Sequence, residues 1–181
     1  MQTILLLGAS GYVGQGLLVE LAQKKEYRIK VLTRQRPETL RTLVSQCNIE
    51  IVQGDLQKPK TLTDFFEPDS FVINLAYLWH AGETGNMKAM DNLLQACKKA
   101  KVRRLIHCST AVVVGNVYGG LVTEDTECYP TNEYESTKLK IETKILSLRG
   151  EGPDVVILRP TSVFGPNAEP IRKLADDLIG G

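Results

Sequence analysis

Tyr134 and Lys138 are the two side chains of this sequence with the clearest potential for chemistry. They lie in the stretch YESTK, four residues apart, so a helix would place them on one face. A free tyrosine has a pKa of about 10 and is a poor base at neutral pH, but a neighbouring ammonium favours the phenolate. The pair can therefore be an acid/base catalyst, or an ordinary pair on a helix surface. Because the spacing alone is a weak signal, the surrounding sequence must decide.

A glycine-rich turn, GASGYVG, occupies residues 8–14 directly after the apolar run TILLL of residues 3–7. Glycine permits a tight turn and lets the backbone approach a pyrophosphate closely. Apolar residues then recur at helical spacing from Val13 on, and the start of this helix would offer free N–H groups to phosphates. The pattern predicts a dinucleotide-binding turn, with a plain strand-to-helix turn as the alternative. The predicted contacts are Gly8, Ser10, Gly11 and Gly14.

The second apolar run ends in VLTR, and this end bears on the type of dinucleotide. A cofactor without a 2′-phosphate usually meets an Asp or Glu here, which bonds the ribose hydroxyls. This sequence has no acidic residue at that place, whereas Arg34 and Arg36 could pair with a 2′-phosphate. Two solvated arginines on a loop are the alternative. The sequence therefore favours NADP over NAD.

Polar or small residues follow three further predicted strands. Asp55 can accept a hydrogen bond from an adenine amino group, or it can cap a following helix. Ala76 is small enough for a cofactor ribose to lie against the backbone, although it could also be a core residue. Ser109 and Thr110 carry hydroxyls that could bind a substrate oxygen or satisfy their own backbone. The cofactor contacts predicted at these strand ends are Asp55, Leu75, Ala76 and Tyr77.

This setting favours the catalytic interpretation of Tyr134 and Lys138. The helix that would carry them follows the two hydroxyls in the order that the sheet requires. A phenol of lowered pKa can exchange a proton with a substrate alcohol or carbonyl while a hydride moves to or from a nicotinamide. Lys138 would also hold the ribose hydroxyls of the cofactor.

The elements that must position these residues alternate along the chain. Short apolar strands are predicted at 3–7, 28–32, 49–52, 71–76, 104–109 and 154–159. Helices are predicted from Val13 on and at 37–46, 60–67, 86–99, 133–148 and 170–179, with a loop at 115–130. Apolar strands separated by helices indicate a parallel sheet covered on both faces. The prediction is an α/β, doubly wound Rossmann fold of strand order 3-2-1-4-5-6, which binds ligands at the carboxyl ends of its strands.

Composition limits the other classes of function. The 181 residues suit one domain, and a net charge of +1 gives no field that favours nucleic acid or an anionic membrane. The apolar run at 4–7 is too short for a secretion signal or a membrane span. Four cysteines without Cys-x-x-Cys spacing, with two histidines, argue against a zinc site, so no metal is expected. We expect a cytoplasmic protein.

Seven motifs in order give the chain a resemblance to a known family. It resembles the extended short-chain dehydrogenase/reductases, the NAD(P)-dependent epimerase/dehydratase group that includes UDP-glucose 4-epimerase. The motifs are GASGYVG (8–14), GDL (54–56), NLA (74–76), NMKAMDNLLQAC (86–97), CSTAVVVG (108–115), YESTK (134–138) and LRPTSVFGP (158–166). The resemblance implies NAD(P) as cofactor and an epimerase, dehydratase or reductase acting on an alcohol or carbonyl, with a nucleotide sugar as a candidate substrate.

The resemblance also implies roles for single residues. Thr110 takes the family's catalytic Ser/Thr position, Tyr134 is the expected acid/base and Lys138 is its partner. The implied cofactor contacts are the backbone around Tyr12 and Val13 for the pyrophosphate, Asp55 and Leu56 for the adenine, and Pro160, Thr161, Ser162 and Val163 for the nicotinamide.

Several features depart from the family's pattern. No acidic residue ends the second strand, and Val114 stands where a tyrosine often precedes glycine. The link YLWHAGETG, residues 77–85, is shorter than usual, and in the family it often reaches the substrate. Family members commonly continue into a smaller substrate domain. We therefore expect a fragment, with an NAD(P)-binding Rossmann domain at 1–169 and the start of a truncated substrate-binding region at 170–181.

Two other classes of function and one assembly are also considered. A non-catalytic NAD(P)-sensing module is the main alternative, although it would not need Thr110, Tyr134 and Lys138 together. A basic cluster could bind RNA, but a solvated helix C-terminus explains it, so no nucleic acid partner is expected. The cluster consists of Lys98, Lys99, Lys101, Arg103 and Arg104. The helices at 86–100 and 133–148 resemble a pairing surface of the family, so a homodimer is expected.

Overall fold

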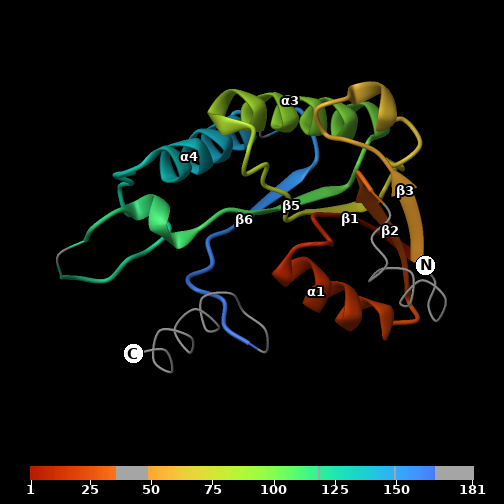
Figure 1. The fold of residues 1–181 in the computed structure, drawn as a ribbon, viewed down its shortest axis with the longest axis horizontal. Coiled ribbons are helices and arrows are strands. Elements are labelled where there is room, and N and C mark those ends of the chain that lie inside the picture. The colour runs from red at the N-terminus through yellow and green to blue at the C-terminus, as the bar shows by residue number, and fades with distance from the viewer. Residues whose placement is uncertain (36–48, 118, 149, 166–181) are drawn as a thin grey trace.

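A six-stranded parallel sheet forms the centre of the molecule (Figure 1). The computed structural model describes residues 1–35, 49–117, 119–148 and 150–165. The strands are β1 (Gln2–Leu7), β2 (Tyr27–Thr33), β3 (Ile49–Gln53), β4 (Phe71–Asn74), β5 (Arg104–Cys108) and β6 (Asp154–Leu158). Their order in the sheet is β3-β2-β1-β4-β5-β6, with neighbouring strands parallel. The predicted fold class and strand order are confirmed.

Helices cover both faces of the sheet (Figure 1). Helix α1 (Tyr12–Ala22) lies on one face, and α3 (Gly82–Ala100) and α4 (Glu133–Leu146) lie on the other. Two short 3₁₀ helices, η1 (Pro59–Thr61) and η2 (Ala111–Val114), lie in connections. Within the described ranges, no helix is both long and apolar enough to cross a membrane.

Strand β1 shows why the strands read as continuous apolar runs. Leu5 and Leu7 pack into the core beneath α3 and α4, whereas Leu6 packs into the core beneath α1. Successive side chains therefore enter opposite apolar layers, so residues 4–7 are apolar throughout rather than alternating. The strand order reverses between β1 and β4, so the carboxyl ends of these two strands open the crevice where such sheets bind ligands.

The helix predicted at residues 60–67 is wrong. The chain forms η1 and then irregular turns. The Thr61 hydroxyl donates to the Lys58 carbonyl oxygen at 2.7 Å and accepts from the Asp55 N–H at 2.9 Å, which closes a tight turn. Phe65 and Phe66 are both buried and meet edge to face, with 5.1 Å between ring centroids. Local side-chain bonds and the anchoring of two adjacent aromatic rings prevail over the helical pattern.

Other boundaries differ by a few residues. Helix α3 begins at Gly82 rather than at residue 86, since the Asn86 amide donates to the Gly82 carbonyl oxygen and to that of Leu78, and accepts from the Leu78 N–H. Helix α4 ends at Leu146, and β4, β5 and β6 each end one or two residues before the predicted boundary. The helices predicted at 37–46 and 170–179 lie outside the described residues.

Candidate active site

The glycine-rich turn lies at the crevice between β1 and β4, and its glycines pack there on backbone atoms alone. Gly8 has φ of 83°, and a Cβ atom there would lie 2.7 Å from the backbone nitrogen of Ala76. A Cβ atom at Gly14 would lie 2.1 Å from the Gly8 carbonyl oxygen. A side chain at either position would therefore push the turn away from α1 or from the end of β4.

The first turn of α1 suits an anion. Its N-cap is Gly11, which offers no side chain to the free N–H groups, and the turn contains no acidic residue. Ser10, Tyr12 and Val13 are exposed around this helix end. Uncapped N–H groups and the helix dipole together favour a phosphate. The close-packed glycines and this helix end fit the pyrophosphate of a dinucleotide, although the contact itself stays a prediction.

Lys138 projects from α4 to the carboxyl end of β5. It is 4% exposed, and its ammonium donates to the Cys108 carbonyl oxygen at 2.7 Å. Burial lowers the pKa of Lys138, and the Glu142 carboxylate acts in the opposite direction. The ammonium lies 5.5 Å from the centroid of the Tyr77 ring. Helix α4 thus holds a cation, largely out of water, beside the end of a central strand.

Tyr134 lies one turn before Lys138 on α4, as predicted, and two further rings surround it. Tyr77 meets it edge to face with 5.0 Å between centroids. Trp79 stacks on it at 5.3 Å, with 13° between the ring planes. Burial raises the pKa of Tyr134, the neighbouring Tyr77 adds to this, and the Thr110 hydroxyl acts in the opposite direction. The phenol therefore favours its protonated form.

The structure does not show the lowered Tyr134 pKa that the sequence predicts from Lys138. The physical reason is the direction of the ammonium, which donates to the Cys108 carbonyl, together with the burial of the phenol. The effect predicted from an oxidised nicotinamide stays a prediction.

Thr110 supplies a hydroxyl at the same strand end. It caps η2, where its Oγ1 accepts from the Val112 N–H at 3.4 Å. The Ala111 N–H donates to the Pro160 carbonyl oxygen at 2.9 Å, which ties this segment to the chain after β6. Ser109 is buried instead, and its hydroxyl has no hydrogen-bond partner among the described residues. The structure brings together the predicted set of Thr110, Tyr134 and Lys138, whose catalytic roles stay predictions.

Asp55 follows β3 at one edge of the sheet and forms hydrogen bonds within its own turn. Its Oδ1 accepts from the Gln57 N–H at 2.9 Å, and its own N–H donates to the Thr61 hydroxyl. This is the capping alternative that the sequence left open, although no α-helix follows. Leu56 is buried, and its carbonyl accepts from the Asn92 amide at 2.7 Å. Adenine contacts at Asp55 and Leu56 stay predictions.

Arg34 follows β2 and is exposed. Its carbonyl oxygen accepts from the Gln53 amide at 3.3 Å, which joins it to the end of β3. Arg36 lies outside the described residues. The exposed guanidinium is compatible with a 2′-phosphate contact, which stays a prediction.

The sequence analysis missed a buried polar pair beneath the crevice. The Asn74 amide nitrogen lies 3.1 Å from His107 Nδ1, and the Asn74 Oδ1 accepts from the Ala76 N–H at 3.1 Å. Burial lowers the pKa of His107 to about 3, and the Lys138 charge adds to this, so the imidazole is neutral. The pair fixes the turn of Leu75, Ala76 and Tyr77 on which Gly8 packs. An Asn and a His in the middle of apolar strands were the available signal.

The segment after β6 runs from helix α4 to the glycine-rich turn. The Arg159 guanidinium donates two hydrogen bonds to Oε2 of the buried Glu142 of α4, at 3.1 and 2.6 Å. Further on, a Cβ atom at Gly165 would lie 2.4 Å from the Tyr12 hydroxyl. The residues between are Pro160 and the exposed Thr161, Ser162, Val163 and Phe164. The predicted contact of residues 160–163 with nicotinamide is compatible with this course.

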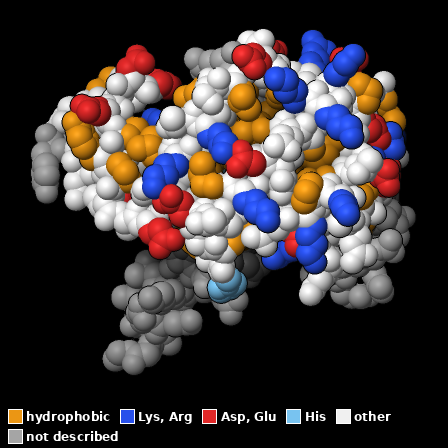
Figure 2. Space-filling model, turned by 90° about the horizontal axis from the view of Figure 1, so that it is seen from above, with side chains coloured by type: hydrophobic (Ala, Val, Ile, Leu, Met, Phe, Trp, Pro, Cys, Tyr) orange, Lys and Arg blue, Asp and Glu red, His pale blue; other side chains and the backbone are white. Residues whose placement is uncertain are grey.

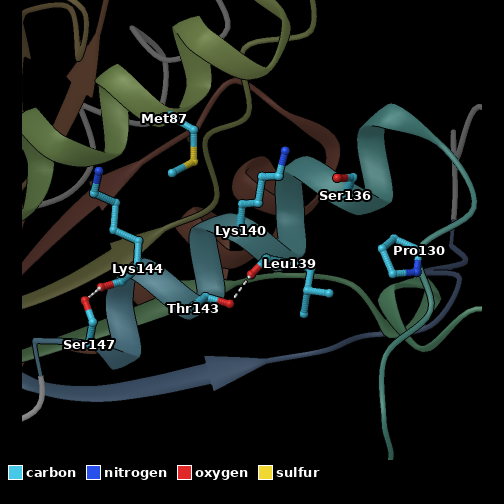
Figure 3. A pocket seen from close by; sticks show the side chains of 8 residues that line it. All are labelled: Met87, Pro130, Ser136, Leu139, Lys140, Thr143, Lys144 and Ser147. Carbon is cyan, nitrogen blue, oxygen red and sulfur yellow. Dashed lines mark hydrogen bonds between the residues drawn. The ribbon is translucent and has the colours of Figure 1, made fainter.

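A separate hollow of about 570 Å³ lies on the outer face of α3 and α4 (Figure 3). Its lining residues are Met87, Pro130, Ser136, Leu139, Lys140, Thr143, Lys144 and Ser147. Tyr134 and Lys138 do not line it. They lie on the other face of α4, so the hollow is not part of the candidate site.

Charges of both signs are interspersed over the face that α3 and α4 form (Figure 2). Lys98 pairs with Glu151 at 3.4 Å, and Arg104 pairs with Asp154 at 3.2 Å. The basic cluster considered for RNA is therefore partly neutralised, and mixed charge gives a polyanion little net attraction.

Comparison with known proteins identifies the family to which the chain belongs. A family model described as the NAD dependent epimerase/dehydratase family matches residues 4–179. The chain is 25% identical to a dTDP-D-glucose 4,6-dehydratase of Dictyostelium discoideum, over 94% of this chain and 46% of that protein. It is 27% identical to a UDP-glucose 4-epimerase of the same organism, over 96% of this chain and 55% of that protein. The chain thus spans about half the length of these relatives.

Solved structures show the same fold. The crystal structure of a dTDP-glucose 4,6-dehydratase from Bacillus anthracis in complex with NAD matches with a TM-score of 0.84 and 21% identity, over 99% of this chain and 62% of that one. A UDP-glucuronic acid 4-epimerase from Bacillus cereus, in complex with UDP-glucuronic acid and NAD, matches with a TM-score of 0.79 and 25% identity, over 97% of this chain and 64% of that one.

Proposed function

Because the chain belongs to the NAD dependent epimerase/dehydratase family, we propose that it binds a nicotinamide dinucleotide for hydride transfer at an alcohol or carbonyl carbon. The observation that carries the proposal is geometric. A turn closed by Gly8 and Gly14 lies at the carboxyl end of β1, and a helix face carrying Tyr134 and Lys138 lies at the carboxyl end of β5, two strands away in the same sheet. Relatives named for nucleotide sugars support that substrate class, with epimerisation, dehydration and reduction as the candidate reactions.

In the proposed reaction, Tyr134 carries the proton. The bound nicotinamide would supply the hydride donor or acceptor. Burial raises the pKa of Tyr134, so the phenol is protonated at neutral pH and can donate to a carbonyl oxygen as its carbon is reduced. The Thr110 hydroxyl would bond the same substrate oxygen. Lys138 would hold the cofactor ribose.

We propose NADP as the preferred cofactor, held in the crevice between β1 and β4. Arg34 supports this choice, because a guanidinium can form a charge-assisted fork with a 2′-phosphate. The compared structures named above bind NAD, so the preference is a property to be tested on this chain. The proposed contacts along the crevice are Gly8, Ser10, Gly11, Tyr12, Val13, Gly14, Arg34, Asp55, Leu56, Leu75, Ala76, Tyr77, Lys138, Pro160, Thr161, Ser162 and Val163.

The larger context of the chain is also proposed. Residues 1–169 would be the dinucleotide-binding domain of a cytoplasmic protein, and 170–181 would begin its substrate-binding region. Two copies would pair through α3 and α4, whose outer faces carry the apolar side chains of Met87 and Leu139 at the rim of the hollow (Figure 3).

The test is a panel of nucleotide sugars offered with NADP or NAD in either redox state. We expect the nicotinamide absorbance or the sugar product to change with at least one sugar, and to stop changing in Tyr134→Phe. A protein that binds the dinucleotide but converts no member of the panel, in the presence of its complete substrate region, would instead be the sensing module.

A further inference from the structure

Two aromatic rings contact the ring of the proposed acid, Tyr134, and one of the two is exposed. Trp79 and Tyr77 come from the segment between β4 and α3, and Tyr134 comes from α4. Tyr77 and Trp79 meet edge to face at 4.9 Å between centroids, and each also contacts Tyr134. Trp79 nevertheless remains 71% exposed. It is the one tryptophan of the chain.

The exposure separates Trp79 from an ordinary core aromatic. A core indole stabilises a fold by leaving water, and Trp79 has kept most of its surface in water. Its place is fixed by its neighbour Leu78, whose N–H and carbonyl both bond the buried Asn86 amide at 2.9 and 3.0 Å. The backbone is therefore clamped at residue 78, and the ring that follows projects onto Tyr134 rather than into the core.

The two rings of this segment restrain the phenol from two sides. Tyr77 presents an edge contact and Trp79 covers a face, in the offset geometries that aromatic quadrupoles favour. The Tyr134 hydroxyl remains close enough to Thr110 for that hydroxyl to affect its proton affinity. Without the indole, one ring face of Tyr134 would be open to water, and its side chain could turn to other rotamers.

We propose that Trp79 is a positioning residue, which stacks on Tyr134 to hold the phenol in its reactive orientation beside Thr110 and to shield it from water. The inference rests on the proposed role of Tyr134 and deepens it. It assigns a purpose to the short link of residues 77–85, which brings a large ring to the acid from outside the helix.

The first test uses fluorescence and needs neither substrate nor cofactor. An ionised tyrosine in contact with an indole quenches its emission, and all tryptophan emission of this chain arises at residue 79. In a Tyr77→Phe background, where Tyr134 is the remaining phenol stacked on Trp79, we expect emission to fall as the pH rises above about 10, the ordinary value for tyrosine. The Tyr77→Phe/Tyr134→Phe protein should lack this step. Circular dichroism at each pH separates ionisation from unfolding.

The second test uses turnover on a substrate found with the panel above. Trp79→Ala should lower kcat about ten- to hundredfold with little change in cofactor KM, because a misoriented acid affects the chemical step. The basic limb of its pH profile should move to lower pH, since water reaches the phenol. Trp79→Phe should restore most of both properties. Leu146→Ala, which removes a part-exposed apolar side chain three turns along α4, should change neither.

The outcomes separate the two proposals. A quenching step that survives Tyr134→Phe, or a Trp79→Ala enzyme with parent kcat and pH profile, would overturn the role of Trp79 alone. A Tyr134→Phe enzyme with the parent rate would overturn the proposed function, whatever the fluorescence shows.

Discussion

The glycine-rich turn and the face of α4 that carries Lys138 and Glu142, here called the wall, make room for a ligand by opposite means. At the turn, Gly8 and Gly14 leave out side chains, so that backbone packs on backbone. At the wall, Lys138 and Glu142 are buried side chains, 4% and 2% exposed, whose charged ends are bonded in place. The turn is thus sensitive to atoms that are added and the wall to atoms that are removed.

The two regions also differ in the distance that their contacts span along the chain. The Gly14 contact with Gly8 lies within one seven-residue motif, whereas the Lys138 bond to Cys108 joins residues 30 apart. A contact within one short motif can be predicted from the sequence, whereas a contact between distant residues depends on the folded sheet. Substitutions that add or remove single groups can test this contrast.

The largest effect is expected at the wall from the loss of one oxygen atom. Tyr134→Phe keeps the ring and its contacts, so stability and cofactor affinity should barely change. Turnover should fall by about two to four orders of magnitude, the usual contribution of a general acid or base. Kinetics on the substrate identified with the panel, with thermal unfolding as control, measure both. Turnover at the parent rate would make Tyr134 a scaffold residue.

Lys138→Met should affect both chemistry and binding. It removes the buried ammonium but keeps an unbranched side chain of similar length, so α4 should remain packed. Turnover should fall about ten- to hundredfold through loss of positioning, and cofactor affinity should also fall because the ribose contact is lost. Parallel titration of Tyr134→Phe with the dinucleotide is the control. Equal affinities in the two variants would remove the ribose role of Lys138.

At the turn, an added methyl group should be the damaging change. Gly14→Ala would place its Cβ 2.1 Å from the Gly8 carbonyl oxygen, so the turn must shift. We expect a loss of about 1–3 kcal/mol in unfolding free energy, as in overpacked sites, with weaker dinucleotide binding. Gly16→Ala is the matched control on the same helix, because nothing lies within 4 Å of its added Cβ.

Gly16→Ala should stabilise α1 by roughly 0.5–1 kcal/mol, since alanine is the better helix former. Chemical denaturation of both variants, with nicotinamide fluorescence for binding, gives the comparison. Similar results for the two alanines would show that the close approach at Gly14 is not required.

An effect on cofactor choice alone is expected at the rim of the crevice, where Arg34 is exposed. The parent chain should bind NADPH more tightly than NADH, and Arg34→Ala should lose that difference. A charge-assisted pair contributes on the order of 1.5–3 kcal/mol, so about tenfold or more should disappear from NADPH affinity alone. NADH affinity is the internal control. Equal affinities for NADPH and NADH in the parent would contradict the assigned preference.

The parts of the fold that sequence alone predicted are those with a short-range cause. The β1 run alternates between two apolar layers, and GASGYVG follows it directly, so strand, turn and helix could be located together. The Tyr134–Lys138 spacing likewise needs only one helix. The strand order followed from general rules for alternating strands and helices rather than from any single residue.

The failures have tertiary causes. The helical pattern at 60–67 yields to bonds of Thr61 and to the burial of two phenylalanines, which depend on the rest of the core. The proton affinity of Tyr134 depends on burial and on Tyr77, and no local spacing reveals either. Trp79 was unrecognised because its partner is 55 positions away in the sequence.

The Arg159–Glu142 pair has a consequence for the order of folding. It joins α4 to the residue that directly follows β6, across 17 residues, whereas the Lys140–Glu83 pair joins α4 to α3 across 57. Closing the shorter loop costs roughly 1 kcal/mol less chain entropy. The unit of α4 and β6 can therefore assemble before α3 docks on it, and its amides should keep hydrogen-exchange protection under conditions in which those of α3 have lost it.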